Sequence, residues 1–159
     1  GRLLITLFLL DQKVLKTPCL YLSYFLKVNR IEYYDRMSEI RRSGNYEQWV
    51  KFFLRAFRDA AADAAKAVEE LSMLHNYHSG VIQAEKRNGN LKRIFAYLEQ
   101  NPIIEIGKTA RELNLAYNTV VKQIEKLLAL GILTPAEKTG KSRTFLYRDY
   151  LAILRRDTE

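Results

Sequence analysis

The residues best suited to chemistry lie between positions 116 and 143 of the chain. A helix predicted to begin near Ala116 carries four polar side chains away from its apolar side: Asn118, Thr119, Lys122 and Lys126. Asn118, Thr119 and Lys122, near the start of the helix, suit contacts with base edges, and Lys126, one turn further on, suits phosphate contact. A basic stretch further along adds three cations and no acid: Lys138, Lys141 and Arg143. Together these residues predict a DNA-binding surface, in which the helix reads bases and the cations hold phosphates.

The neighbouring elements predict how these residues are positioned. Apolar residues recur on the same helix at helical spacing: Val120, Ile124, Leu127 and Leu128. A shorter helix at Lys108–Leu113, which contains the small Ala110, breaks at Asn114, and Gly131 ends the second helix in the left-handed region. Two helices joined by a tight turn form the helix-turn-helix pattern, whose second helix enters the major groove. A plain helical hairpin in a core is the alternative.

The flanking segments favour the helix-turn-helix. Ile132–Thr134 and Arg143–Tyr147 are predicted to pair as strands around the basic loop, and a helical run at Leu91–Gln100 precedes the helix pair. We therefore expect a mainly α chain in which residues 89–159 form a winged helix-turn-helix domain with a small β-hairpin wing. Residues 1–88 would form a helical domain that includes a long connecting helix. A solvated charged face without a ligand is the alternative for the basic residues.

The composition is that of a globular protein, and its charge is not concentrated in one half. The 159 residues include 26 Lys or Arg and 18 Asp or Glu, for a net charge of +8. Residues 91–159 hold 12 basic and 8 acidic residues and residues 1–90 hold 14 and 10, so each part carries +4. The single cysteine, Cys19, excludes an intrachain disulfide and fits a reducing cytoplasm. The apolar run Leu3–Leu10 is too short to span a bilayer, so we expect a cytoplasmic protein.

A long helix is predicted from Tyr46 to Ser79, because no glycine or proline interrupts this stretch. Its second half carries a stripe spaced alternately by four and three residues: Ala60, Ala64, Ala67, Leu71, Leu74, His78 and Val81. Such a stripe packs within its own chain or forms a subunit interface, here a homodimer through residues 60–81. His75 and His78 are expected to be structural, with no metal site, because few carboxylates lie near them.

Earlier in the chain, three shorter helices are expected. Leu3–Gln12 is apolar on all sides and predicts a helix buried nearly all round, as expected for a fragment of a longer protein. Cys19–Val28 fits a helix or a strand, and its helical neighbours favour a helix. An amphipathic helix is expected at Glu32–Arg42, before a stop at Ser43–Asn45.

The first half of the chain resembles the carboxy-terminal part of the Fic family. Gly1–Leu4 is similar to the end of that family's signature, His-x-Phe-x-Asp/Glu-Gly-Asn-Gly-Arg-x-x-Arg. The stretches LYLSYFLKVNRIEYYDRM (Leu20–Met37) and GNYEQWVKFFL (Gly44–Leu54) resemble segments that follow the signature in many bacterial members. A winged helix after the helical core is also similar to a common arrangement in the family, so the resemblance covers essentially the whole chain.

The resemblance implies a parent enzyme that transfers AMP from ATP, with Mg²⁺, to a side-chain hydroxyl of a target protein. It implies that Arg2, at the last signature position, contacts the terminal phosphates. It also implies that Tyr33, Tyr34 and Met37 line the adenine pocket, with Arg41 where an asparagine often stands. The signature's general base, metal ligand and phosphate loop are not in this sequence, so we expect no catalysis and no cofactor in this chain. A short winged-helix transcriptional regulator, with residues 1–88 as a dimerisation domain, is the alternative.

Overall fold

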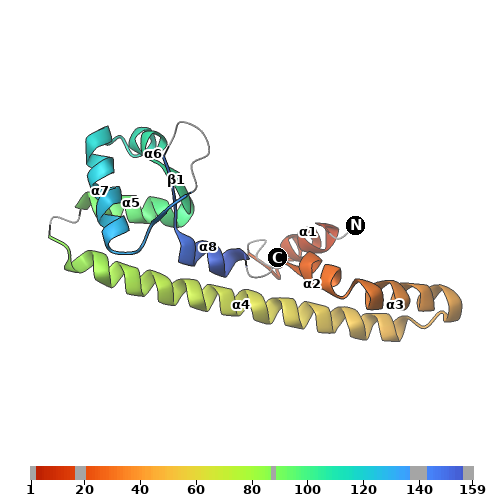
Figure 1. Ribbon diagram of the computed structural model, residues 1–159. Helices are drawn as coiled ribbons and strands as arrows, with labels where there is room; N and C mark the ends of the chain where they lie inside the picture. The colour runs from red at the N-terminus through yellow and green to blue at the C-terminus, as the bar shows by residue number, and fades with distance from the viewer. Residues whose placement is uncertain (1–2, 17–20, 87–88, 137–142, 156–159) are drawn as a thin grey trace. The chain divides into compact units, whose positions relative to one another are not determined.

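The computed structural model describes residues 3–16, 21–86, 89–136 and 143–155. Within these ranges the chain is mainly α, with eight helices and one three-stranded antiparallel sheet (Figure 1). The chain separates into two compact units, and the division falls inside the longest helix, between Glu69 and Glu70. The predicted domain boundary lies after residue 88, beyond the end of that helix.

The first unit contains three helices and the start of a fourth: α1 (Leu3–Asp11), α2 (Leu22–Val28), α3 (Arg30–Ser43) and α4 (Tyr46–Ala84). Its core joins α2 to α4 through five buried apolar residues: Leu22, Leu26, Phe52, Ala56 and Ala60. Gly44, at φ 72°, ends α3 in the left-handed region, and its N–H donates to the carbonyl of Ile40. The expected stop before α4 is therefore confirmed. Within the segment 19–28, α2 (Leu22–Val28) confirms the helix that was favoured over a strand.

The first helix differs from its prediction. No residue of α1 is buried, and four of its large apolar side chains are between 50% and 71% exposed: Leu3, Leu4, Leu7 and Phe8. Only the side that carries Ile5 and Leu9 packs against the core of this unit. The prediction of a helix buried nearly all round is thus wrong for the described chain, because neighbours cover α1 on one side alone.

The long helix α4 continues without a break through Gly80 and ends at Ala84. Residues near both ends of the predicted stripe pack within the chain itself. Ala60 belongs to the core of the first unit, whereas Leu74 and His78 pack in the second. Homodimer formation through residues 60–81 remains a prediction.

The second unit adds to the end of α4 the following elements: α5 (Gly89–Gln100), β1 (Ile103–Glu105), α6 (Ile106–Glu112), α7 (Tyr117–Ala129), β2 (Thr134–Pro135), β3 (Thr144–Leu146) and α8 (Arg148–Arg155). The sheet order is β1-β3-β2, with Ile104 opposite Phe145 and Thr134 opposite Leu146. Helices α5, α6 and α7 contribute buried side chains to one apolar cluster with this sheet. Helix, strand, two helices and a β-hairpin, in this order, make a winged helix-turn-helix.

The helix-turn-helix follows the sequence closely. Asn114, at φ 49°, takes the left-handed conformation between α6 and α7, and Gly131, at φ 73°, does so after α7. Ala110 is buried in the core, which suits close packing of α6. Both breaks are confirmed, and in the predicted stripe of α7 Val120, Ile124 and Leu127 are buried, whereas Leu128 is partly buried.

The sheet follows the sequence less closely. The strand β1 was not predicted, because three residues between Pro102 and a helix show no alternation long enough to recognise. The predicted strand at Ile132–Thr134 begins only at Thr134. The reason is that the N–H groups of Ile132 and Leu133 donate to the carbonyl of Leu127 at the end of α7, and so do not join the sheet.

Candidate nucleic-acid interface

Helix α7 presents one stripe of side chains to solvent. The residues on this stripe are spaced by four, three and four, and all are exposed: Asn118, Lys122, Glu125 and Ala129. The opposite side of α7 is held in the core, since Val120, Ile124 and Leu127 are at most 1% exposed. The core therefore fixes the direction in which two predicted DNA-binding residues, Asn118 and Lys122, point.

The other two polar residues predicted on this helix, Thr119 and Lys126, lie on its flank and are half-buried. The Nζ atom of Lys126 is 3.6 Å from Oε2 of Glu85, just beyond the end of α4. An exposed ion pair of this kind adds little to stability, but the carboxylate reduces the attraction of this lysine for phosphate. Among the predicted residues of α7, Asn118 and Lys122 are thus the ones that face solvent with no partner in the described chain.

An open hollow beside the start of α7 brings predicted and unpredicted residues together. Asn118 from α7 and Arg143 from the start of the last strand both line it, although they are far apart in the sequence. Further polar lining comes from β1, α6 and α7: Glu105, Lys108, Arg111 and Tyr117. The sequence analysis did not predict Lys108 and Arg111 as binding residues. Their spacing of three residues, with two small residues between them, is the signal that places both on one side of α6.

The hollow carries net positive charge. Three cations line it, Lys108, Arg111 and Arg143, against the single carboxylate of Glu105. The Nζ atom of Lys108 also lies 3.8 Å from Oε1 of Glu112. Neither guanidinium has an ion-pair partner among the residues that the structure describes. Free guanidinium groups that line one hollow can bind phosphate oxygens with two hydrogen bonds each.

Two side-chain contacts hold α6 against α5. The hydroxyl of Tyr97 donates to Oε2 of Glu112 over 2.7 Å. Burial, followed by this hydrogen bond, raises the pKa of Tyr97 to about 12. The Nη2 atom of Arg93 donates to the carbonyl of Leu113 over 2.8 Å, which caps the end of α6. These contacts position the cationic side of α6 at the hollow.

Tyr147, directly after β3, anchors the sheet in the core. It is fully buried, its N–H donates to the carbonyl of Pro102 over 2.9 Å, and its hydroxyl lies 2.7 Å from Nδ1 of His78 on α4. Burial raises the pKa of the Tyr147 phenol, and the charges of Glu99 and Asp149 add to this shift. Burial lowers the pKa of His78, although the same two charges act in the opposite direction there. Both groups are therefore neutral near pH 7, and their hydrogen bond ties the base of the wing to α4.

His75, the other histidine of α4, also has structural partners. Its Nδ1 atom lies 2.6 Å from Oε1 of Glu99, and its ring stacks on Phe95 at a centroid distance of 5.9 Å. Across the described residues, no three His, Cys, Asp or Glu side chains gather in a way that could hold a metal ion. No helix in the same part of the chain is both long enough and apolar enough to cross a membrane.

Of the nucleotide-binding residues predicted in the first unit, only Tyr33 packs against the buried core cluster among those that the structure describes. The ring of Tyr33 packs edge-on against Trp49 at 5.4 Å, and Met37 is half-buried. Tyr34 is 56% exposed, and the guanidinium carbon of Arg30 lies 5.6 Å from its ring centroid. Their role in binding adenine stays a prediction that follows from the resemblance.

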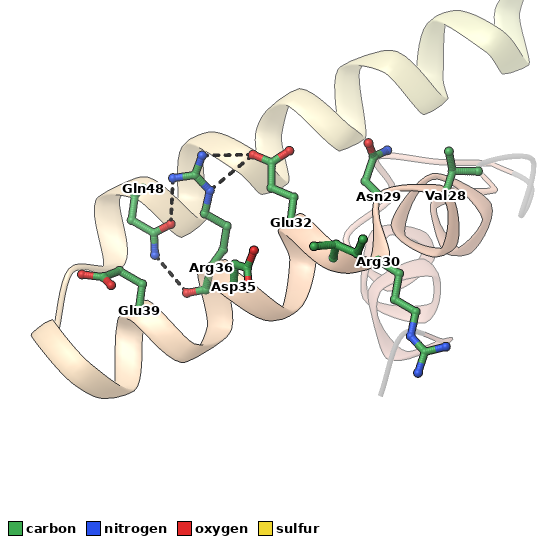
Figure 2. Close-up of a pocket in the computed structure, with 9 residues that line it drawn as sticks. Val28, Asn29, Arg30, Glu32, Asp35, Arg36, Glu39 and Gln48 are labelled. Atoms are coloured by element: carbon green, nitrogen blue, oxygen red, sulfur yellow. Dashed lines mark hydrogen bonds and ion pairs between the residues drawn. The ribbon is translucent and has the colours of Figure 1, made fainter.

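A pocket in the first unit is lined by residues of α2, α3 and α4 and of the junction at Asn29, and none of Tyr33, Tyr34 and Met37 lines it (Figure 2). At its centre Arg36 binds Oε1 of Glu32 at 3.0 Å and donates to Oε1 of Gln48 at 3.3 Å. Gln48 in turn donates from Nε2 to the carbonyl of Arg36 over 3.0 Å, as Figure 2 shows. This network joins α3 to α4 across their turn. Because three acidic and two basic residues line the pocket, it offers no net positive charge to a nucleotide.

Three predicted residues, Arg2, Lys138 and Lys141, lie outside the described residues. No protein-family model matches the chain. The Fic resemblance therefore rests on the sequence segments quoted above, whereas the assignment to the winged helix-turn-helix class rests on the topology of the second unit.

Proposed function

We propose that the second unit binds duplex DNA, with the exposed stripe of α7 in the major groove and the hollow against the phosphate backbone. The observation that carries this proposal is the hollow, where Asn118 at the start of α7 meets unpaired arginines from α6 and from the start of β3. An α-helix with its side chains, about 10–12 Å across, fits a major groove about 12 Å wide. A groove-inserted helix brings the backbone to its flanks, which is where Arg111 and Arg143 lie.

The proposal is tested by the salt dependence of binding. Replacing Arg111 or Arg143 with Ala should weaken binding to all duplexes alike and reduce the slope of log K against log salt by about 0.9 each. Arg55→Ala, an exposed arginine on α4 in the first unit, removes the same charge and should leave the slope unchanged. If the chain retains no duplex at low salt, or if all three variants behave alike, the second unit is not a DNA reader.

A second proposal concerns the first unit and is favoured by the exposed apolar side of α1. By resemblance, this unit is the carboxy-terminal part of a Fic-type domain, in which further helices cover Leu3, Leu4, Leu7 and Phe8. The longer parent would then transfer AMP from ATP, with Mg²⁺, to a protein hydroxyl. This chain, which lacks the signature's base and metal ligand, is expected to label no protein when incubated with Mg²⁺ and labelled ATP. Robust labelling would refute that expectation.

The alternative is a winged-helix transcriptional regulator in which residues 1–88 serve only for dimerisation. Its supporting feature is the regular stripe through residues 60–81. Sedimentation distinguishes the two proposals, because a regulator of this kind is a dimer at the micromolar concentrations at which it binds DNA.

A further inference from the structure

Glu125 is an acid on the side of α7 that is proposed to meet DNA. It follows Asn118 by seven residues and Lys122 by three, so the three side chains share one exposed stripe. Two other acids near the helix pair are engaged: Glu85 pairs with Lys126, and Glu112 accepts a hydrogen bond from Tyr97. Glu125 has no hydrogen bond or ion pair with any residue in the described part of the chain.

A free carboxylate in this place has a definite physical consequence. Facing a polyanion within a Debye length of about 8 Å, it repels phosphates and lowers affinity for every duplex alike. This loss of affinity is offset only where the carboxylate accepts a hydrogen bond from a base. In the major groove the exocyclic amino group of cytosine is a donor that suits a carboxylate.

The reach of α7 agrees with such a contact. At 1.5 Å per residue, Glu125 lies about 10 Å beyond Asn118 along the helix. This separation corresponds to about three base pairs of duplex, at about 3.4 Å each. Asn118 and Glu125 therefore address positions within one stretch of major groove, with Lys122 between them.

We propose that Glu125 is a specificity-determining residue that accepts a hydrogen bond from the N4 amino group of a cytosine, at a position about three base pairs from the one that Asn118 reads. The inference rests on the proposed DNA binding and deepens it. The recognised DNA site would then contain a C·G pair at one fixed position. Glu125 would weaken binding to duplexes that lack this pair.

The test is selection of bound sequences from a pool of randomised duplexes, followed by titration of the best and of scrambled duplexes. Three forms of the full chain are compared: the unchanged chain, Glu125→Gln and the control Glu69→Gln. Glu69 is an exposed acid on α4 in the first unit, so both variants change the net charge equally. We expect Glu125→Gln to bind scrambled duplexes more tightly and to lose its preference for cytosine at one position by about 5- to 150-fold. Glu69→Gln should keep that preference.

The outcomes separate this inference from the proposal on which it rests. If the unchanged chain selects a sequence but Glu125→Gln selects the same one with the same preference, the inference is overturned and DNA binding stands. Equal tightening on all duplexes without a change of preference also overturns it, since repulsion alone explains that result. If the unchanged chain retains no duplex at low salt, DNA binding itself fails and the inference fails with it.

Discussion

The buried hydrogen bond between Tyr147 and His78 offers a direct test of what stabilises the winged unit. Tyr147→Phe removes the hydroxyl that lies 2.7 Å from Nδ1 of His78 and leaves this ring nitrogen without its partner. Tyr147 is fully buried and His78 is only 5% exposed, so water does not readily take the place of the lost hydroxyl. A buried polar atom left unpaired in this way costs about 1–3 kcal/mol in the free energy of unfolding.

Ring packing does not contribute to this loss, because phenylalanine keeps the contacts of the aromatic ring. The matched control is Tyr150→Phe. The ring of Tyr150 stacks on Tyr147 at 5.2 Å, it is half-buried, and its hydroxyl has no hydrogen bond to a described residue. This control should change the free energy of unfolding by less than about 0.5 kcal/mol.

The suitable assay is amide hydrogen exchange in α5 and α7, which reports opening of the second unit. Trp49 lies in the first unit, so tryptophan fluorescence does not report on this change. A loss of 1–3 kcal/mol should speed exchange by about 5- to 150-fold in Tyr147→Phe. If Tyr147→Phe and Tyr150→Phe exchange at the same rates, the hydrogen bond does not stabilise the unit and the reasoning is refuted.

The same pair predicts a dependence of stability on pH. Burial lowers the pKa of His78 below its usual value, so the unfolded chain binds a proton more readily than the folded one. Above the usual histidine pKa of about 6.5, neutral His78 therefore costs the folded chain no stability. As the pH falls below this value, the free energy of unfolding decreases by up to about 1.4 kcal/mol per pH unit. His78→Gln should flatten this part of the profile between pH 7.5 and 5.5. An unchanged profile would show that other groups cause the loss.

Three further predictions concern the interface, the first core and the oligomeric state. Asn118→Ala should relax discrimination between duplex sites by about 1–3 kcal/mol, measured by competition binding, and a uniform loss on all sites would contradict base reading. Leu26→Ala should leave a cavity in the first unit and lower its free energy of unfolding by about 2–5 kcal/mol, measured by Trp49 fluorescence. DNA retention should stay unchanged, and its loss would show that binding needs the first unit. Ala67→Glu should dissociate a homodimer formed through residues 60–81, and sedimentation that shows only monomer before the change would refute that interface.

The helix pair was predictable because each of its signals is local. Val120, Ile124 and Leu127 repeat at the helical period, and Asn114 and Gly131 stand where the backbone takes positive φ. These features depend on residues within a few positions of one another, so a single sequence contains them in full.

The elements that were missed depend on partners distant in the sequence. The strand β1 exists because β3 pairs with it, and its three residues have no pattern of their own. The exposed side of α1 depends on which helices lie nearby, whereas the sequence shows only that the helix is apolar. Position in space, and not residue type, decides both.

The charges that favour the proposed function also depend on position in space. The net charge of +8 is divided evenly along the chain, so it does not locate a binding surface. What locates one is which cations remain unpaired after folding. Lys126 faces Glu85, whereas Arg111, Arg143 and Lys122 have no ion-pair partner among the described residues. The two arginines share one hollow beside the stripe that contains Lys122, and this arrangement, visible only in three dimensions, is what favours a phosphate backbone as the ligand.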